Sequence, residues 1–410
     1  MHKVLRPLTQ FLSFCLLIAP ALHAEKPATI DEKVAGMRKL DGYFPLYWDE
    51  RTGNLWLEIS RFDNDFLLAT GIAAGLGSND IGLDRGLEDG GKVVSFQRVG
   101  PKVLLVQGSE SFRSSSPNPA ERRSVEDSFA KSILWGFTVG AESGGRVLVD
   151  ATDFFVRDGG GAATTLSGAG TYKADRTRSA VYLPRTKAFP KNTEIEVTVT
   201  FTYEASAGRG GGGFAPTQGP PPIQVPAPGA GTGRSARGFG VGLFSGSVAS
   251  VTPTAEAVTL REHYSLVELP DSNYRPRLDD PRAGYGGPNF VDYSTPIGEP
   301  MVQRYIARHR LEKKDPSAAM SDPVKPIEYW VDPGAPEDVR KALIEGASWW
   351  NEAFEAAGFR NAFKVAVLPE GADPMDIRYN MINWCIARRA AGASGVRSAI
   401  RAQARSSRAP

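Results

Sequence analysis

The chain has 410 residues, of which 41% are hydrophobic and 23% are charged. This length exceeds that of one ordinary compact domain and predicts two or three domains, and the hydrophobic fraction excludes a chain that is disordered throughout. The 48 basic and 46 acidic side chains nearly balance, so the net charge gives no general reason to expect a nucleic-acid partner. The two cysteines, Cys15 and Cys385, cannot form a disulfide scaffold.

The first 24 residues have the features of an export signal. Lys3 and Arg6 give a positive start, a mostly apolar stretch covers residues 11–22, and Ala24 is the small residue that a signal peptidase requires. The apolar stretch is shorter than the roughly 20 residues of a membrane-spanning helix. We therefore expect a signal peptide over residues 1–24, a mature chain exported to the periplasm or the extracellular space, and no integral membrane segment.

The part from residue 25 to residue 300 is patterned as short strands separated by turns. Residues 41–60 predict a hairpin, and the clearest strand is 194–203, whose apolar and polar residues alternate strictly. Such repeated strands predict an antiparallel sheet, as a sandwich or open barrel, interrupted by a helix around 119–131. Further strands are expected at 66–70, 92–99, 102–107, 133–139, 146–150, 248–251 and 257–269.

Residues 205–238 differ from their surroundings because they are dominated by glycine and proline. Such a composition cannot bury much apolar area, so it predicts a loop or linker. The glycine run 208–213 lacks the Gly-Lys-Ser/Thr sequence of a phosphate-binding loop, and nucleotide binding is not indicated. Residues 271–300 are rich in turn-forming residues.

From residue 301 the pattern becomes that of an α/β unit. Residues 301–311 suit either a helix or a strand, and 336–357 predicts a helix that starts with acidic residues and ends at Gly358. Trp350 follows the helical spacing of the apolar residues, so we expect it in the core and not, with Trp349, in a sugar-binding platform. Strands are predicted at 327–331, 363–368 and 377–380.

The side chains that could carry chemistry are few. His263 and His309, the histidines of the mature chain, lie far apart and outside any H-E-x-x-H string, so we expect surface or hydrogen-bonded structural roles for them. There is no Gly-x-Ser-x-Gly elbow, since 242–246 has the wrong spacing, although a Ser-His-Asp set stays open. Carboxylates such as Glu121, Glu126 and Asp279-Asp280 are expected on the surface or in turns. The sequence thus predicts no catalytic, cofactor-binding or metal-binding residue.

Several short blocks of the sequence follow a recognisable pattern. The most specific is E-G-A-S-W-W-N-E-A-F-E-A-A-G-F at 345–359, followed by Asp373-Pro374 and by D-I-R-Y-N at 376–380. On these blocks, the chain from residue 25 to residue 384 resembles a family of secreted bacterial zinc-dependent metalloproteases of the metzincin type. The remaining blocks are D-G-Y-F-P-L-Y at 41–47, Y-R-P-R at 274–277, D-P-R-A-G-Y at 280–285 and P-V-K-P-I at 323–327.

The resemblance implies a β-rich N-terminal region followed by a metalloprotease domain in which helix 336–357 backs the predicted strands. In the intact family a zinc-bound water hydrolyses a peptide bond of a protein or peptide substrate, and an extended H-E-x-x-H-x-x-G-x-x-H motif follows the position matching Asn380. None of those positions occurs here, so we expect no zinc in this chain and an inactive N-terminal fragment whose helix exposes part of its apolar face. The alternative is a non-enzymatic exported binding module of the cell envelope.

Residues 385–410 differ in composition from everything before them, with six arginines and no acid. GC-rich coding DNA read in a shifted frame gives this bias, so we expect an aberrant tail that follows a frameshift near the Trp384 codon. The alternative is a genuine basic arm that contacts nucleic acid or anionic lipid. The predicted fold is α+β, with a hairpin region at 25–90, a β-rich domain at 91–300, the start of a metalloprotease domain at 301–384 and the basic tail at 385–410.

Overall fold

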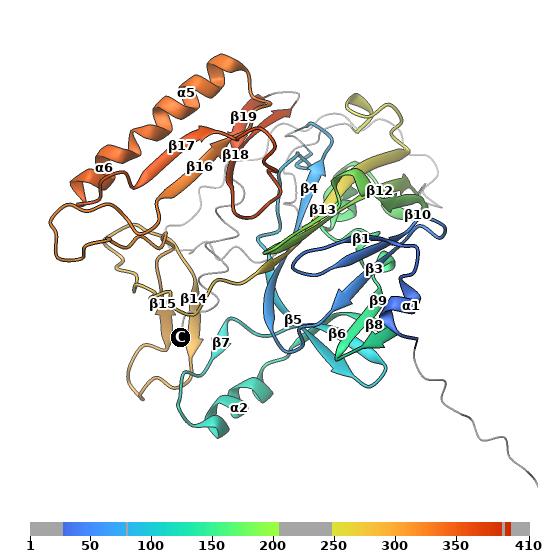
Figure 1. Cartoon of the computed structure of the whole chain (residues 1–410), viewed down its shortest axis with the longest axis horizontal. Helices are drawn as coiled ribbons and strands as arrows, with labels where there is room; N and C mark the ends of the chain where they lie inside the picture. Colours follow the sequence, from blue (N-terminus) through green and yellow to red (C-terminus); the bar gives the residue numbers. More distant parts are fainter. Residues whose placement is uncertain (1–27, 79–80, 205–247, 388–389, 395–410) are drawn as a thin grey trace, which may run out of the picture.

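The structure, a computed structural model, describes residues 28–78, 81–204, 248–387 and 390–394. These residues form a large β sheet, a small three-stranded sheet and an α/β unit (Figure 1). The expected β-dominated, antiparallel fold is confirmed. The expected signal peptide, the loop 205–238, the sequence 242–246 and most of the basic tail lie outside the described residues. Within the described part of the chain, no helix is long and apolar enough to cross a membrane.

The large sheet has 12 strands, and every pair of neighbouring strands in it is antiparallel. Its strands are β1 (Arg38–Leu40), β2 (Leu46–Asp49), β3 (Asn54–Ile59), β4 (Asp65–Ala74), β5 (Lys92–Val99), β6 (Lys102–Gln107), β8 (Ser132–Ser143), β9 (Arg146–Asp150), β10 (Tyr172–Val181), β11 (Lys187–Phe189), β12 (Asn192–Tyr203) and β13 (Ala257–Glu268). They follow the order β1-β2-β3-β9-β8-β6-β5-β4-β13-β12-β10, and β11 pairs with β12. We call this sheet and the segments inside it the β unit.

The β unit curls around one hydrophobic core. The apolar residues of β12 from Ile195 to Phe201 point into it and are fully buried, as the alternation of the sequence predicts. Two short helices fill the inside of the curl and add Phe154, Phe155 and Leu166 to the same core. The short helices of the β unit are α1 (Ile30–Lys33), α3 (Thr152–Phe155), α4 (Ala162–Leu166), η1 (Ser167–Ala169), η2 (Leu183–Arg185) and η3 (Val248–Ser250).

The two ends of the large sheet meet, which closes the curl on one side. The N–H of Tyr43, just before β2, donates to the carbonyl of Phe189 in β11 at 2.8 Å. The hydroxyl of Thr193 in β12 donates to the carbonyl of Phe44 at 2.9 Å. Gly42 makes this approach possible, because a Cβ there would lie 2.7 Å from the Cβ of Ala188.

Several sequence expectations for this part need correction. Residues 248–250 form the 3-10 helix η3 and not a strand. The turn-rich stretch 271–300 contains strand β14 (Asn289–Asp292), which pairs with β15 (Val302–Arg304) and with β7 (Phe112–Arg113) in the three-stranded sheet. These strands are too short to show a period in the sequence. Strands on both sides of residue 90 belong to the one large sheet, and helix α2 (Pro119–Ser128) lies beside β7 (Figure 1).

The α/β unit contains a mostly parallel sheet with two helices. Strand β16 (Ile327–Val331) runs parallel to β17 (Phe363–Val367) and β18 (Asn380–Ala387), and β18 pairs antiparallel with β19 (Ala390–Ser394). Helices α5 (Glu337–Ser348) and α6 (Trp350–Ala356) connect β16 to β17 and lie along one face of this sheet (Figure 1). The phenyl rings of Phe354 and Phe363 stack between helix and strand at 5.9 Å.

The expectation that Trp350 lies in the core is wrong. The helix breaks at Trp349, and the side chains of Trp349 and Trp350 are 66% and 60% exposed. Neither α5 nor α6 contains a buried residue. Helical spacing predicts which residues share a face, but it does not tell whether another layer covers that face.

The third strand of the α/β unit begins later than expected. Residues 376–379 form a turn in which the N–H of Tyr379 donates to the carbonyl of Asp376 at 3.0 Å, so β18 starts at Asn380. The strand then continues past Trp384, and residues 385–387 and 390–394 of the expected basic tail take part in the hairpin β18–β19.

Candidate functional site

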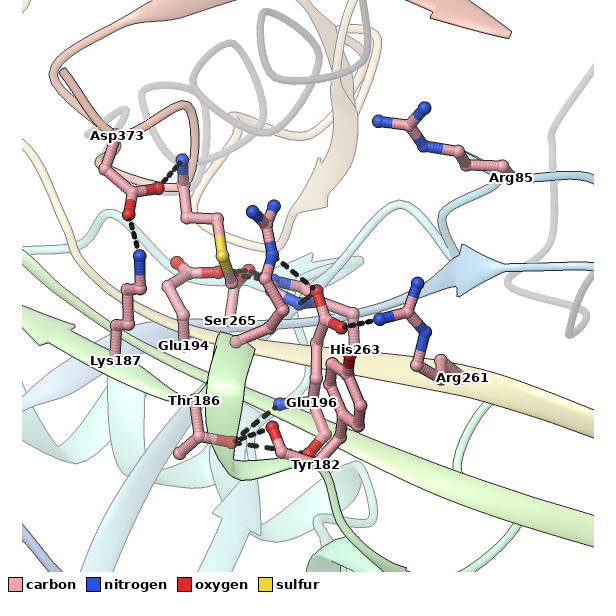
Figure 2. Close-up of polar contacts among 12 residues, drawn as sticks. Arg85, Tyr182, Thr186, Lys187, Glu194, Glu196, Arg261, His263, Ser265 and Asp373 are labelled. Carbon is pink, nitrogen blue, oxygen red and sulfur yellow. Dashed lines mark hydrogen bonds and ion pairs between the residues drawn. The ribbon is translucent and has the colours of Figure 1, made fainter. Parts of the chain in front are cut away.

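The two histidines in the part of the chain that the structure describes lie in different surroundings. His309 is exposed, and its Nε2 lies 3.4 Å from the hydroxyl of Tyr329. His263, on β13, belongs to a polar group on the outer face of the large sheet, the face opposite the main core. This group, which we call the outer-face cluster, consists of Glu194, Glu196, His263 and Ser265 (Figure 2).

The register of β12 and β13 brings the outer-face cluster together. Glu194 lies opposite Ser265, and Glu196 lies opposite His263. Because alternate residues of a strand point to opposite faces and Ile195 points into the core, both glutamates point outward. Cross-strand neighbours and diagonal neighbours on one face are within reach of each other, which explains the contact between His263 and Glu194.

Glu194 is the centre of the cluster and is fully buried. Its Oε2 accepts a hydrogen bond from the Ser265 hydroxyl at 2.7 Å and a short contact from Nε2 of His263. Its Oε1 accepts a short hydrogen bond from Nδ2 of Asn192. Buried carboxylates need such partners because transfer of a charge from water to the interior is costly.

Glu196 is nearly as buried, with 4% of its surface exposed, and two arginines lie near its carboxylate. Nε of Arg185 lies 3.6 Å and Nη1 of Arg261 lies 3.5 Å from its two oxygens. Nδ1 of His263 lies 3.8 Å from its Oε1. Since guanidinium groups keep their charge at all ordinary pH values, Glu196 has two permanent counter-charges.

The geometry of the cluster does not suit nucleophilic catalysis. In a Ser-His-acid set, the serine and the acid contact different nitrogens of the imidazole. Here Ser265 Oγ, at 3.0 Å, and Glu194 both contact Nε2 of His263, and the serine donates its hydrogen to the carboxylate. The hydroxyl of Ser265 therefore donates to Glu194, and His263 is not placed to remove its hydrogen and make the oxygen a nucleophile.

The cluster also does not suit a metal ion. The two carboxylates approach different nitrogens of His263, so their oxygens and one imidazole nitrogen do not converge on a single point. Over residues 28–78, 81–204, 248–387 and 390–394, no group of three or more His, Cys, Asp or Glu side chains is arranged to hold a metal ion. The described residues thus do not fit the zinc that the metzincin resemblance implies for the intact family.

The segment 368–379, which joins β17 to β18, docks on the outer face of the β unit. The side-chain amide of Asn192 donates to the carbonyl of Met375 at 2.8 Å and accepts from the N–H of Ile377 at 3.2 Å. Lys187 on β11 forms a close ion pair with Asp373 (Figure 2). The side chain of Ile377 packs in a small apolar group with Leu67, Ala69, Val93, Val267 and Leu269.

A second contact joins the two units near β16. Asp332, directly after β16, accepts from the N–H of Trp384 at 3.3 Å and lies 4.0 Å from Nη2 of Arg85 in the β unit. The thiol of Cys385 donates to the carbonyl of Arg85 at 3.3 Å. Among the described residues, the α/β unit therefore contacts the β unit both at the segment 368–379, through polar and apolar groups, and beside β16, through polar groups.

The ion pair between Lys187 and Asp373 helps to lower the pKa of Asp373. Burial alone would raise the pKa of Asp373, but the hydrogen bond from Lys187 and the backbone N–H of Met375 outweigh it and lower this pKa. Asp373 therefore stays ionised as the pH falls below the range in which an ordinary aspartate becomes protonated.

A different buried acid lies inside the curl of the β unit. Glu262 accepts from the N–H groups of Gly159 and Gly160 at 2.9 and 3.3 Å. Burial and the neighbouring charge of Asp158 raise the pKa of Glu262 to about 8. Sequence reasoning missed this residue, although its place in the inward alternation of Leu260 and Tyr264 on β13 is a usable signal.

The structure also has an open pocket of about 570 Å³ beside the turn between β8 and β9. Arg98 in its wall pairs with Glu142 at 2.5 Å, and Arg146 pairs with Glu58 at 2.8 Å. Because each arginine already has an acidic partner, the pocket offers no excess charge to an ionic ligand.

Taken together, the fold and the outer-face cluster define a β-rich protein with an attached α/β unit, in which buried polar residues hold the two units together. The chain belongs to the family described as Domain of unknown function (DUF5117), whose model matches residues 86–314, more than half of the chain. The match includes β12, β13 and the whole outer-face cluster, and it ends before β16. No curated protein and no solved structure matches the chain.

Proposed function

We propose that this chain is a non-catalytic N-terminal part of an exported metallopeptidase-like protein, in which the β unit docks and orients the α/β unit. The observation that carries the proposal is the paired hydrogen bond of Asn192 with Met375 and Ile377. A side-chain amide that both donates to and accepts from one stretch of backbone fixes the position and direction of that stretch. Such a contact orients the strand that follows, β18.

The energetics of the contact agree with a docking role. Ile377 is 6% exposed, and burying an aliphatic side chain of this size contributes roughly 1.5–3 kcal/mol. The hydrogen bonds of Asn192 with Met375 and Ile377 each contribute roughly 0.5–1.5 kcal/mol, because undocking exchanges them for hydrogen bonds with water. Both terms favour the docked arrangement over separated units.

The metallopeptidase part of the proposal is supported by the resemblance in sequence. Its most specific block, 345–359, falls on α5 and α6, and the block 373–380 falls on the docked segment. Helices α5 and α6 lie beside the parallel strands β16 and β17, and a sheet backed by helices supports the proposal. Because the described residues do not fit zinc, no catalytic step is assigned to them.

One observation favours the alternative function, a binding module of the cell envelope. The side chains of Trp349 and Trp350 are largely exposed on the helices. Exposed tryptophan supplies a large apolar face for a partner. A retention assay on purified cell-wall polymer with wild-type chain and Trp350→Ala would separate the alternatives: loss of retention in the variant favours the module, and no retention of either protein favours docking alone.

The proposed function is tested with purified chain 1–410. Zinc content after metal loading and dialysis, and hydrolysis of an unfolded protein substrate, should both stay at background. A His263→Gln, His309→Gln double variant serves as control, because these are the described histidines that a zinc ion could use. Stoichiometric zinc together with peptidase activity in the wild-type chain, lost in the double variant, would refute the proposal.

A further inference from the structure

The docked segment 368–379 crosses the outer face of the large sheet from one strand to the next. Ile377 belongs to an apolar group with residues of β4, β5 and β13. Asn192, at the start of β12, holds the backbone at Met375 and Ile377, and Lys187 on β11 pairs with Asp373 (Figure 2). These strands are neighbours in the order β5-β4-β13-β12, and β11 pairs with β12. The segment therefore reaches from β5 to β11.

Strand β11 is also the place where the curl of the β unit closes. The carbonyl of Phe189 in β11 accepts from the N–H of Tyr43 at 2.8 Å. The hydroxyl of Thr193 in β12 both donates to the carbonyl of Phe44 and accepts from its N–H, at 2.9 and 3.0 Å. We call this contact between Tyr43 and Phe44 on one side and Phe189 and Thr193 on the other the seam.

The residues of the seam adjoin the residues that hold the docked segment. Phe189, which bonds across the seam, lies directly opposite Asn192 in the pairing of β11 with β12. Asn192 precedes Thr193 in the chain, and Lys187 lies two positions before Phe189 on the same strand. Both contacts therefore depend on the position of the same few residues of β11 and β12.

Strand β11 has few contacts of its own to fix its position. It has three residues, all of them half-buried, and it pairs with β12. Short elements with little buried apolar surface open more readily than the core of a sheet. The ion pair of Lys187 with Asp373 adds a contact to this strand from the outer face, so the docked segment restrains β11 beside the seam.

We propose that the segment 368–379 is a strap that keeps the curl of the β unit closed, so that docking of the α/β unit and closure of the seam stabilise each other. When the strap leaves, β11 loses its ion pair and Asn192 loses the backbone that it holds. When the seam opens, β11 and the start of β12 can shift, which displaces Lys187 and Asn192 from the strap. Coupling between two contacts is reciprocal, because each changes the equilibrium of the other by the same factor.

This proposal rests on the proposed docking function and adds what docking does to the β unit. Its test follows the hydrogen exchange of three backbone N–H groups in chain 1–410 by NMR or mass spectrometry. The N–H of Tyr43 reports opening of the seam, and the N–H at position 377 reports undocking. The N–H of Val139 donates to the carbonyl of Pro101 at 3.0 Å in the middle of the strand order and reports unfolding of the whole sheet. Exchange rates relative to that of Val139 therefore separate local opening from global unfolding.

Two variants weaken the strap at different places. Ile377→Ala acts on the side of β4 and β5, away from β11, and Asp373→Asn acts at β11. Both should accelerate exchange of the Tyr43 N–H by at least about fivefold relative to Val139, since coupled sites in proteins typically change each other's equilibria by 5- to 150-fold. Such an effect of Ile377→Ala reaches the seam from the far end of the strap.

The reverse experiment opens the seam and observes the strap. Gly42→Ala places a Cβ against β11 and should accelerate exchange of the N–H at position 377, relative to Val139, by a similar factor. Gly108→Ala is the matched control, because nothing lies within 4 Å of its Cβ position, and it should change neither relative rate.

The outcomes separate the strap from docking itself. Unchanged relative exchange of Tyr43 in Ile377→Ala and Asp373→Asn, or of position 377 in a Gly42→Ala variant whose seam has opened, would overturn the inference and leave docking intact. A position-377 amide that exchanges freely in the wild-type chain would overturn the proposed docking as well. If Ile377→Ala loses its circular dichroism signal, Asp373→Asn alone decides the question.

Discussion

Asn192 on β12 and Ile377 before β18 are joined by a hydrogen bond of 3.2 Å although 185 positions separate them in the chain. This bond links the outer face of the curled β unit to the segment that leads into the parallel sheet of the α/β unit. Asn192 also donates a hydrogen bond to Glu194, which in turn contacts His263. Lys187 and Asp373 form an ion pair between the same two parts of the chain. The contact between the units therefore combines polar groups with the buried side chain of Ile377 and is built from several elements.

The interior acid Glu262 should make the stability of the β unit fall as the pH rises. Its pKa of about 8 lies above the ordinary value of 4.5, so from pH 4.5 to 8 the unfolded chain loses a proton that the folded chain keeps. Glu262→Gln should therefore raise the free energy of unfolding by a few kcal/mol at pH 8 and by little at pH 4.5. Urea unfolding at both pH values measures this. The control is the exposed Glu126→Gln, and an equal effect of Glu262→Gln at both pH values would contradict the assignment.

The closure of the curl depends on Gly42. A Cβ there would lie 2.7 Å from the backbone nitrogen of Phe189, which cannot move without breaking the pairing of β11 with β12. Gly42→Ala should destabilise the protein by about 1–3 kcal/mol in denaturant unfolding. Gly108→Ala is the matched control, because nothing lies within 4 Å of its Cβ position. Equal stability of the two variants would show that the ends of the sheet do not meet.

The exposed tryptophan of the helix break should contribute little to stability. Trp350 is 60% exposed, whereas Ile327 on β16 is 5% exposed. Trp350→Ala should change the free energy of unfolding by no more than about 0.5 kcal/mol. Ile327→Ala should cost roughly 2–5 kcal/mol. A large loss in Trp350→Ala, measured by the same urea titration, would mean that another layer covers the helix in solution.

The ion pair of Lys187 and Asp373 should determine how far the pH can fall before the docking of the α/β unit weakens. The pKa of Asp373 is lower in the folded chain than in the unfolded chain, so its contribution is present above the ordinary pKa of aspartate and is lost as the pH falls through the lowered value. Exchange of the Ile377 amide should therefore accelerate in strongly acidic solution. Asp373→Asn should dock more weakly at neutral pH and show a smaller acid loss. An unaltered acid profile in this variant would exclude the pair as the cause.

The sequence predicted local features better than contacts between distant parts. The alternation of β12 and β13 has a period of two, so the inward and outward faces could be assigned, and the hairpin of β2 and β3 appeared at its expected position. The prediction that Trp350 lies in the core was wrong, because periodicity does not reveal which face of a helix another layer covers. Asn192 gave no signal, since its role depends on a backbone segment far along the chain.

The candidate site was predictable only in part. The sequence predicted either a surface or a hydrogen-bonded structural role for His263, and the structure places it in a hydrogen-bonded network. Its partners Glu194 and Ser265 could not be assigned, because the register between β12 and β13 depends on a long connection that carries no pairing signal. The pairing of strands fixes which polar side chains meet, and a single sequence does not determine it.

The most direct test of docking is the exchange rate of the Ile377 amide at pH 5.5 in wild-type chain, in Asn192→Ala and in Asn54→Ala. Asn54 donates to Asp150 at 2.7 Å in an exposed part of the β unit and serves as the matched control. The account predicts strong protection in the wild type and in Asn54→Ala, and a loss of at least about tenfold in Asn192→Ala, since a buried partner left unsatisfied costs roughly 1–3 kcal/mol. An Ile377 amide that exchanges equally fast in all three proteins would contradict it.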